Sequence, residues 1–297
     1  PPTLRRETQP HEPVIAPQAP EAMAAEIARL PVTASNGDLT AHIAEARSIP
    51  TTLREIGRLR EITFRAAGEG TGTPCDLDAF DRHYLHLFLW NAKKREVAGA
   101  YRLKAVDANT PVEDLYTSTL FRYDKTFLRG LGCGVELGRS FIRAEYQRSF
   151  SALLLLWKAI GAWVVAHPDH TVLFGPVSIS SRYGDRARQA IYSFLSQTAW
   201  LDSLAKTVRA RTRFGTAQTA NEARDVDELD DAVGGIPVLL RQYLKLGGKL
   251  IGFNVDKAFS DVLDGMIVVD LRKTDRKLLD RYFTREGAEK ILSKGSL

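Results

Sequence analysis

A glutamate and an arginine interrupt the stretch GVELGRSFI (134–142), which otherwise has the apolar pattern of a β-strand. Because side chains alternate between the two faces of a strand, Glu136 and Ser140 are expected on one face and Arg139 on the other, with the apolar side chains. A carboxylate in a partly dry cleft has a raised pKa and can act as a general base toward an amine nucleophile. A buried structural ion pair explains the same two residues equally well, so this strand alone leaves both interpretations open.

Charged residues upstream of this strand strengthen the catalytic interpretation when they are taken together. Each one alone is most simply a charge on a solvated face. In their order and spacing, however, the set resembles the residue set of acyl-homoserine-lactone synthases, N-acyltransferases of the GNAT fold that take acyl chains from acyl carrier protein. The residues that carry this resemblance are Arg60, Asp78, Asp81, Arg102, Glu136 and Arg139. Asp76 lies in the same acidic loop, and Phe64 follows Arg60 by one helical turn.

The remainder of the chain resembles a different branch of the same fold. LGRSFI, LLLLWKAIGAWV, LFGPVSISSRYGDRARQ and PVLLRQYLKLGGKLIGFNVD together resemble the hemolysin-like GNAT family, whose members include the ornithine-lipid N-acyltransferases. The resemblance extends from about Leu39 to Leu271. It implies an enzyme that transfers a (3-hydroxy)acyl chain from acyl carrier protein to the α-amino group of an amino acid such as ornithine, which makes a lyso-aminolipid. It also implies a cytoplasmic location, peripheral to the inner face of the cell membrane.

The loop after the Glu136 strand departs from the pattern of acetyl-CoA-dependent GNAT enzymes. Those enzymes carry [QR]-x-x-G-x-[GA], whose backbone N–H groups hold a pyrophosphate at a helix N-terminus. Here the loop reads QRSFSA, with Phe150 in place of the first glycine, and a side chain there blocks close approach of the backbone. Phosphopantetheine on a carrier protein has a single phosphodiester and needs less of that cradle. We therefore expect its thioester to be the donor, with no tightly bound cofactor.

The segment SISSRYGDRAR supplies further candidates. The resemblance implies that Tyr183 protonates the leaving thiolate, although a packing role explains a tyrosine there equally well. Ser178 and Ser180 are expected either to bind substrate or to cap the turn. Basic residues around this segment are expected to attract an acidic carrier protein or an anionic membrane surface. They are Arg148, Arg182, Arg186, Arg188, Lys206 and Arg209. Since no aromatic residues are interleaved with them, a nucleic-acid partner is not expected.

Two other classes of function remain open from the sequence. An acetyl-CoA-dependent N-acetyltransferase of small molecules would use the same strand. A non-catalytic module that binds carrier protein or membrane would need only the basic residues. A metal site is not expected, because His83 and His86 have no third ligand at a suitable spacing. The two cysteines, Cys75 and Cys133, rule out a disulfide scaffold and fit a reducing compartment.

The elements that must position these residues follow from hydrophobic periodicity. Strands are expected at 39–46, 83–92, 96–105, 134–142, 171–180, 249–256 and 264–271, and helices at 49–68, 149–166, 185–201, 237–248, 274–283 and 285–292. Alternation of these elements predicts an α/β fold with a GNAT-like central mixed sheet flanked by helices, and strands that splay at the acyl-donor cleft. The apolar helix at 149–166 is shorter than the roughly 20 residues of a membrane span.

The N-terminus has a different composition from the rest. Six prolines fall within the first twenty residues, which is typical of an extended linker. We therefore expect a linker over residues 1–36 and one acyltransferase domain over residues 37–297. No histidine is followed by aspartate at the H-x-x-x-x-D spacing of lysophospholipid-type O-acyltransferases. The linker would suit a tether to such a domain upstream in a longer chain.

Overall fold

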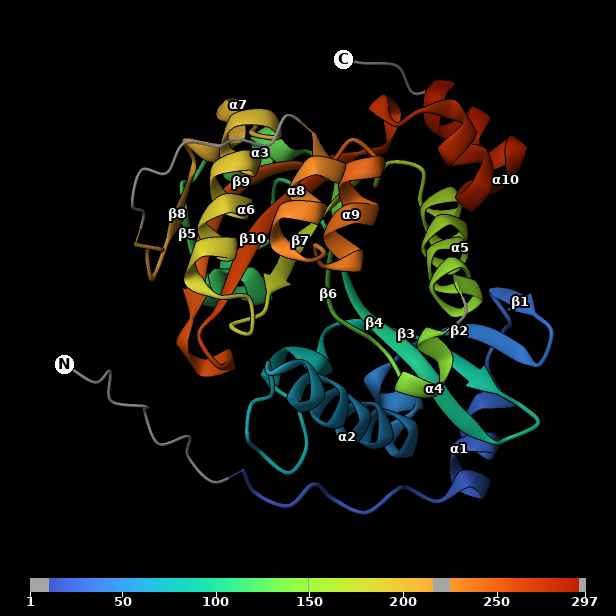
Figure 1. Ribbon diagram of the computed structural model, residues 1–297. Coiled ribbons are helices and arrows are strands. Elements are labelled where there is room, and N and C mark those ends of the chain that lie inside the picture. The colour runs from blue at the N-terminus through green and yellow to red at the C-terminus, as the bar shows by residue number, and fades with distance from the viewer. Residues whose placement is uncertain (1–10, 149, 216–224, 294–297) are drawn as a thin grey trace.

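A computed structural model describes residues 11–148, 150–215 and 225–293. Within them, an eight-stranded sheet has the order β1-β2-β3-β4-β6-β7-β10-β9 (Figure 1). Only β6 and β7 pair in parallel, so the sheet is mixed. The predicted α/β class and central mixed sheet are confirmed. In chain order the strands are β1 (Ala34–Asn36), β2 (Leu39–Glu45), β3 (Leu85–Asn91), β4 (Glu96–Val106), β6 (Gly134–Ile142), β7 (Val172–Ile179), β9 (Lys249–Asp256) and β10 (Val262–Asp270).

A layer of helices covers one face of the sheet. Trp157, Ile191 and Tyr243 of these helices share one hydrophobic core with Leu137 of the sheet. α5 is apolar all round because it lies between the sheet and α10. The helices of the layer are α5 (Phe150–Ala166), α6 (Asp185–Thr198), α8 (Val226–Val233), α9 (Val238–Lys245) and α10 (Arg276–Ser293). The expected helix start at Ser149 lies outside the described residues, and so does the Phe150 side chain.

Two separate groups of elements cover the opposite face. α2 (Pro50–Ala67) packs on β4 and β6 through apolar side chains at helical spacing, with Pro50 in its first turn and Gly68 as a left-handed C-cap. A two-stranded sheet, β5 (Phe121–Tyr123) with β8 (Val208–Ala210), lies over a third core beside β9 and β10. The short helices α3 (Phe127–Leu131) and α7 (Asp202–Ala205) belong to this third core, which was not predicted.

The second half of the expected linker is folded onto the domain, which corrects the expected boundary at residue 36. α1 (Pro20–Ile27) buries Met23 and Ile27 against α2, and β1 pairs with β2. Glu26 accepts hydrogen bonds from the backbone N–H groups of Thr51 and Thr52, both at 2.8 Å, and thereby caps the N-terminus of α2. Residues 1–10 of the expected linker lie outside the described part. Across the described ranges, none of the helices has the length and apolar character needed to cross a bilayer.

A β-bulge in β6 changes which side chains share a face. Arg102 of β4 lies opposite Gly138, whereas Ala100 lies opposite Phe141, so β6 has one residue more than its partner here. Arg139 has a φ of 49°, in the left-handed region. Leu137 therefore packs with the helical layer, and Phe141 with α2 on the other face. The sequence analysis predicted the side chains of Glu136 and Arg139 on opposite faces of β6. This prediction is wrong, because both side chains contact Tyr116.

Candidate active site

A cavity of about 540 Å³ opens where β6 and β7 part. The two strands pair only from Gly134–Val172 to Glu136–Phe174 and then diverge. Two β7 residues explain the divergence. Pro176 has no N–H group to offer a strand partner. Gly175 lies so close to β6 that a Cβ there would stand 2.0 Å from the Leu137 carbonyl oxygen. The predicted splay is thus present at the expected pair of strands.

Part of the cavity lining is apolar, and the other part, its polar end, carries charged and hydroxyl groups. Phe141 of β6, Leu153 and Leu156 of α5, and Leu239 of α9 contribute hydrocarbon surface. The polar end presents charged and hydroxyl groups from six elements or their adjoining loops. They are Glu69, Tyr116, Arg139, Ser178, Asp256 and Asp264. Such a cavity can hold an acyl chain at one end and a small charged molecule at the other.

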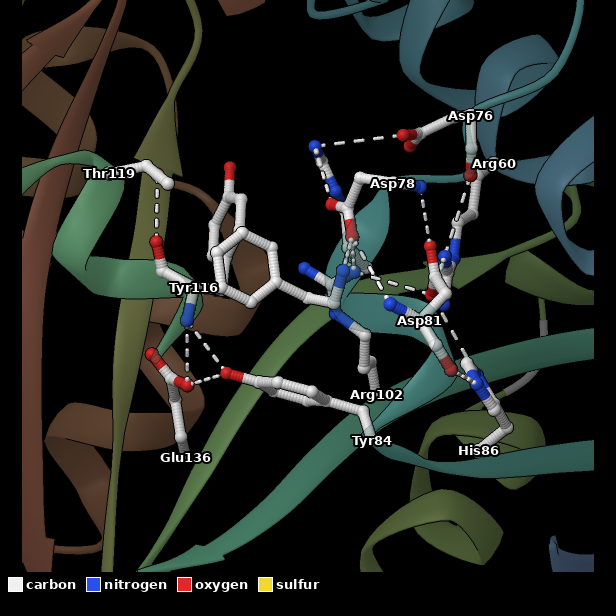
Figure 2. Close-up of polar contacts among 12 residues, drawn as sticks. Arg60, Asp76, Asp78, Asp81, Tyr84, His86, Arg102, Tyr116, Thr119 and Glu136 are labelled. Atoms are coloured by element: carbon white, nitrogen blue, oxygen red, sulfur yellow. Dashed lines mark hydrogen bonds and ion pairs between the residues drawn. The ribbon is translucent and has the colours of Figure 1, made fainter. Parts of the chain in front are cut away.

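Beneath the polar end lies a buried network of ion pairs, which Figure 2 shows. Arg60 of α2 lies 2.8 Å from Asp81, and Arg102 of β4 lies 2.7 Å from Asp78 and 3.3 Å from Asp81. Arg139 extends the network, at 3.6 Å from Asp76 and 3.8 Å from Asp78. The tertiary structure therefore brings together five of the six charged residues that the sequence singled out.

Local sequence makes the acidic loop rigid. Asp78 accepts hydrogen bonds from the backbone N–H groups of Phe80 and Asp81, while the Asp81 carboxylate accepts one from the Asp78 N–H. This reciprocal capping begins a short 3₁₀-helix, Ala79–Arg82. Burial alone would raise the pKa of Asp81, but the guanidinium groups of Arg60 and Arg102 hold it well below its usual range. The Asp81 carboxylate is therefore a permanent negative charge in the network.

Aromatic rings complete the support of the network. The Arg102 guanidinium lies 4.9 Å from the ring centroid of Tyr84 and 4.9 Å from that of Tyr116. Arg139 lies 5.0 Å from the Tyr116 ring and 4.7 Å from the Phe259 ring. Such contacts stabilise a desolvated cation over a ring face. Among the predicted site residues, Arg139, Phe64 and Ser178 line the cavity.

Glu136 does not face the cavity, so the expectation that it lies in an open cleft is wrong. Its side chain is 1% exposed, and it is not among the lining residues. Its carboxylate accepts hydrogen bonds from the Tyr84 hydroxyl and from the N–H groups of Tyr116 (3.2 Å) and Thr117 (2.8 Å) (Figure 2). These bonds hold the start of the 3₁₀-helix Tyr116–Thr119. The geometry makes Glu136 an anchor for Tyr116, whose ring does line the cavity.

Three carboxylates in the cavity were missed by the sequence analysis. Burial raises the pKa of Asp264 to about 8, and among the described residues its hydrogen-bond partner is Ser178, whose hydroxyl donates at 2.7 Å. Burial also raises the pKa of Glu69, to about 7, and that of Asp256. Asp264 left a usable signal, because it is an acidic residue inside an otherwise apolar strand. The sequence gives no comparable signal for Glu69 and Asp256, which are charged residues near the end of an element.

The remaining candidates occupy varied places. Ser178 lines the cavity, as expected of a substrate-binding residue. Ser180 instead donates a hydrogen bond to the Ala67 carbonyl (2.8 Å), and Arg182 donates one to the Ala66 carbonyl (2.5 Å), so both tie their loop to the end of α2. Tyr183 is half-buried, packs on the main core and does not line the cavity.

The six basic residues do not form one surface. Arg148 follows the short helix α4 (Ala144–Gln147), Arg186 and Arg188 are on α6, and Lys206 and Arg209 belong to α7 and β8. In Figure 1, α7 lies at the upper edge of the molecule, whereas α4 lies in its lower half. Arg188 is moreover engaged with Asp185 at 3.1 Å. A single basic patch is therefore wrong.

Histidines are structural in the described residues. His86 is fully buried, its Nε2 lies 2.8 Å from the Asp81 carbonyl oxygen, and burial lowers its pKa to about 4. No group of three or more His, Cys, Asp or Glu side chains in the described ranges is placed to hold a metal ion.

Comparison with known proteins gives the class of the fold. Residues 59–158, which include α2, the acidic loop and β6, match the model of the Acetyltransferase (GNAT) domain family. Among solved structures, the N-acyl amino acid synthase FeeM from uncultured soil microbes has a TM-score of 0.44 at 12% identity, over 80% of this chain and 94% of that one. The CoA-dependent acyl-homoserine lactone synthase BjaI has a TM-score of 0.42 at 11% identity, over 80% and 86%.

Curated relatives give the family. The chain is 31% identical to an L-ornithine N(alpha)-acyltransferase of Rhodobacter capsulatus over 253 residues, 78% of this chain and 91% of the relative. It is 36% identical to a glycine N(alpha)-acyltransferase of Bacteroides thetaiotaomicron over 206 residues, 63% of this chain and 60% of the relative. A glycine N(alpha)-acyltransferase of Phocaeicola vulgatus matches at 35% over 63% of this chain and 62% of that protein. The chain belongs to this family of GNAT N(alpha)-acyltransferases, and it spans about three fifths of the length of the two glycine relatives.

Proposed function

We propose that this protein is an N-acyltransferase that moves a (3-hydroxy)acyl chain from acyl carrier protein to the α-amino group of an amino acid such as ornithine, making a lyso-aminolipid. The observation that carries the proposal is the two-ended cavity between the splayed strands β6 and β7. Its hydrocarbon end suits an acyl chain, and its charged end suits an amino acid. Family membership supports the same reaction class, since the relatives' names include both glycine and L-ornithine as acceptors.

The charged end supplies groups for each part of an α-amino acid. Arg139 is the guanidinium that lines the cavity, and it suits the acceptor carboxylate because its planar fork matches two oxygens. Asp264 takes the place that the sequence analysis gave to Glu136. Its raised pKa, about 8, makes it a base that can remove a proton from an ammonium group near neutral pH.

The reaction then proceeds by direct attack. The α-ammonium group loses one proton to Asp264, and the freed amine attacks the thioester carbonyl carbon. Backbone N–H groups along the part of β6 that has no β7 partner stabilise the oxyanion. The carbon–sulfur bond breaks as the amide forms, and the second amine proton reaches the thiolate through the Tyr116 hydroxyl. Tyr116 is assigned this role in place of Tyr183 because it lines the cavity.

A carrier-protein donor is supported by the loop between β6 and α5. The glycine that lets a loop backbone approach the pyrophosphate of coenzyme A is replaced by Phe150. A phosphopantetheine arm makes a smaller demand on that loop, because it has one phosphodiester in place of the pyrophosphate.

The test uses the purified protein with 3-hydroxyacyl carrier protein, the matching 3-hydroxyacyl-CoA, and acetyl-CoA as donors, and with ornithine and glycine as acceptors. Mass spectrometry of the products identifies the head group and the chain together. We expect N-(3-hydroxyacyl) amino acid from the carrier-protein donor, with slower turnover from the CoA thioester. Preferential turnover of acetyl-CoA would contradict the proposal and favour a small-molecule acetyltransferase.

A further inference from the structure

Carboxylates outnumber cations at the polar end of the cavity. Arg139 is the single Lys, Arg or His side chain among the described lining residues, and its Nη2 already lies 3.6 Å from Asp76. The lining carboxylates are Glu69, Asp256 and Asp264. Over the described ranges, none of the three has a cationic nitrogen within 4.0 Å. A desolvated carboxylate without a counter-charge is unfavourable, so an arriving cation would stabilise this end of the cavity.

The three carboxylates differ in the hydrogen bonds that they accept from the rest of the protein. Asp256 accepts a hydrogen bond from the Ala258 N–H at 2.9 Å and caps the 3₁₀-helix Lys257–Phe259. Asp264 accepts one from Ser178 at 2.7 Å. The oxygens of Glu69 accept none from any described residue. Arg182, the nearby cation, donates instead to the Ala66 carbonyl at 2.5 Å. Of the three lining carboxylates, Glu69 is the one that accepts no hydrogen bond from a described residue.

Glu69 is also held in place by its backbone. Gly68 ends α2 in the left-handed conformation, and the N–H of Glu69 donates to the Phe64 carbonyl at 2.7 Å. This C-cap directs the residue after α2 toward the cavity that Phe64 and Ala67 also line. The carboxylate is thus presented by a helix end, and no cationic nitrogen of the described residues lies within 4.0 Å of it.

An acceptor with a second cation would match this arrangement. The carboxylate and α-ammonium groups of an amino acid account for Arg139 and Asp264. We propose that Glu69 recognises a second ammonium group on the acceptor's side chain, so that this chain selects a dibasic amino acid of the ornithine type over glycine. The inference rests on the proposed function, and it opposes a simple transfer of the acceptor from the glycine relatives, which have the higher identity.

The experiment compares ornithine with norvaline, which has the same carbon chain without the second ammonium group, and with glycine. Each is assayed with 3-hydroxyacyl carrier protein on the wild type and on Glu69→Gln. We expect wild type to prefer ornithine over norvaline by at least about 10-fold in kcat/KM, as one charge-assisted hydrogen bond allows. Glu69→Gln is expected to abolish that preference by raising KM for ornithine, while norvaline and glycine turnover stay unchanged.

Glu286→Gln on α10 is the charge-matched control, because its side chain is 79% exposed and pairs with Lys290. Retained norvaline turnover shows that Glu69→Gln is folded. The inference is overturned if wild type uses norvaline or glycine as well as ornithine, or if Glu69→Gln keeps the ornithine preference. If no acceptor is acylated at all, the proposed function fails, and calorimetric titration of both proteins with ornithine and norvaline alone decides the inference. Glu69-dependent binding of ornithine would still support it.

Discussion

At the scale of single residues, Asp264 and Glu136 illustrate how environment decides the role of a carboxylate. Both are nearly inaccessible to solvent, at 3% and 1% exposed. The Glu136 carboxylate accepts hydrogen bonds from a hydroxyl and two backbone N–H groups and does not line the cavity, so a substrate in the cavity does not reach it. Asp264 has one hydroxyl partner and faces a cavity. Asp264 of β10 is therefore the carboxylate that can accept a proton from a substrate in the cavity.

Replacing the Asp264 carboxylate should remove the base while it stabilises the fold. Asp264→Asn is expected to lower kcat about 10²-fold or more, the usual contribution of a positioned base. Its thermal midpoint at pH 9 should rise by several degrees, since a desolvated charge is lost. Pre-steady-state assays and thermal denaturation measure the two effects. Full activity in Asp264→Asn would exclude Asp264 as the base.

Replacing the Glu136 carboxylate should act only through Tyr116. Glu136→Gln keeps the size of the side chain but weakens the bonds to the Tyr116 and Thr117 N–H groups. We expect a loss of about 1–3 kcal/mol in stability, as for a buried hydrogen-bond partner, and lowered kcat/KM. The pH profile of kcat/KM should keep the position and shape it has in wild type. A profile that loses its acidic limb in Glu136→Gln would instead restore Glu136 as the base.

At the scale of elements, the site depends on the short contact at which β6 and β7 separate. Gly175 allows β7 to lie against the Leu137 carbonyl, and Pro176 then prevents further pairing. The bulge at Arg139 bends β6 in the same region. Two local irregularities in adjacent strands therefore open the cavity, and the helices on both faces close its sides.

Gly175→Ala tests this geometry. The added Cβ would lie 2.0 Å from the Leu137 oxygen, so the strands must shift. We expect a loss of roughly 1–3 kcal/mol in stability, as for overpacking, and a raised KM for the acyl donor. Gly184→Ala is the matched control, since a Cβ there meets nothing within 4 Å. Denaturant unfolding and steady-state kinetics measure both. Equal behaviour of the two variants would contradict the importance of the contact.

At the scale of the whole molecule, two groups of carboxylates make stability depend on pH in opposite directions. The pKa of Asp81 is lowered, because its guanidinium partners outweigh the effect of burial, so its contribution is present above pH 4 and is lost on acidification. The pKa values of Glu69 and Asp264 are raised by burial, to about 7 and about 8. Their contributions are complete at low pH and are lost as pH rises toward 8.

The thermal midpoint of the wild type should therefore be highest near pH 5, fall as pH rises from about 5 to 8, and level off above pH 8. Asp264→Asn should flatten the alkaline part of the curve and leave the acidic part unchanged. A series of thermal denaturations across pH, with Glu286→Gln as a surface control, measures the dependence. A wild-type curve that rises steadily from pH 5 to pH 9 would contradict the raised pKa values.

The amino-acid sequence alone was sufficient for most strands of the large sheet and for the acidic loop. Hydrophobic periodicity located β2, β3, β4, β6, β7, β9 and β10, because each strand has a buried face that its own residues encode. Reciprocal capping by Asp78 and Asp81 is likewise local. The ion partners Arg60 and Arg102 were found through a family resemblance in their spacing, since nothing local relates a helix to a loop and a distant strand.

Only the tertiary structure decided which side chains reach the cavity. The period-two alternation of side chains along β6 fails at the bulge. The extra residue is defined by the pairing of β6 with β4 rather than by the sequence of β6 itself. Glu69, Asp256 and Asp264 come from the end of α2 and from two strands near the C-terminus, and they meet only when β10 inserts between β7 and β9. Burial then raises their pKa values, and burial is a property of the packed molecule that no local pattern contains.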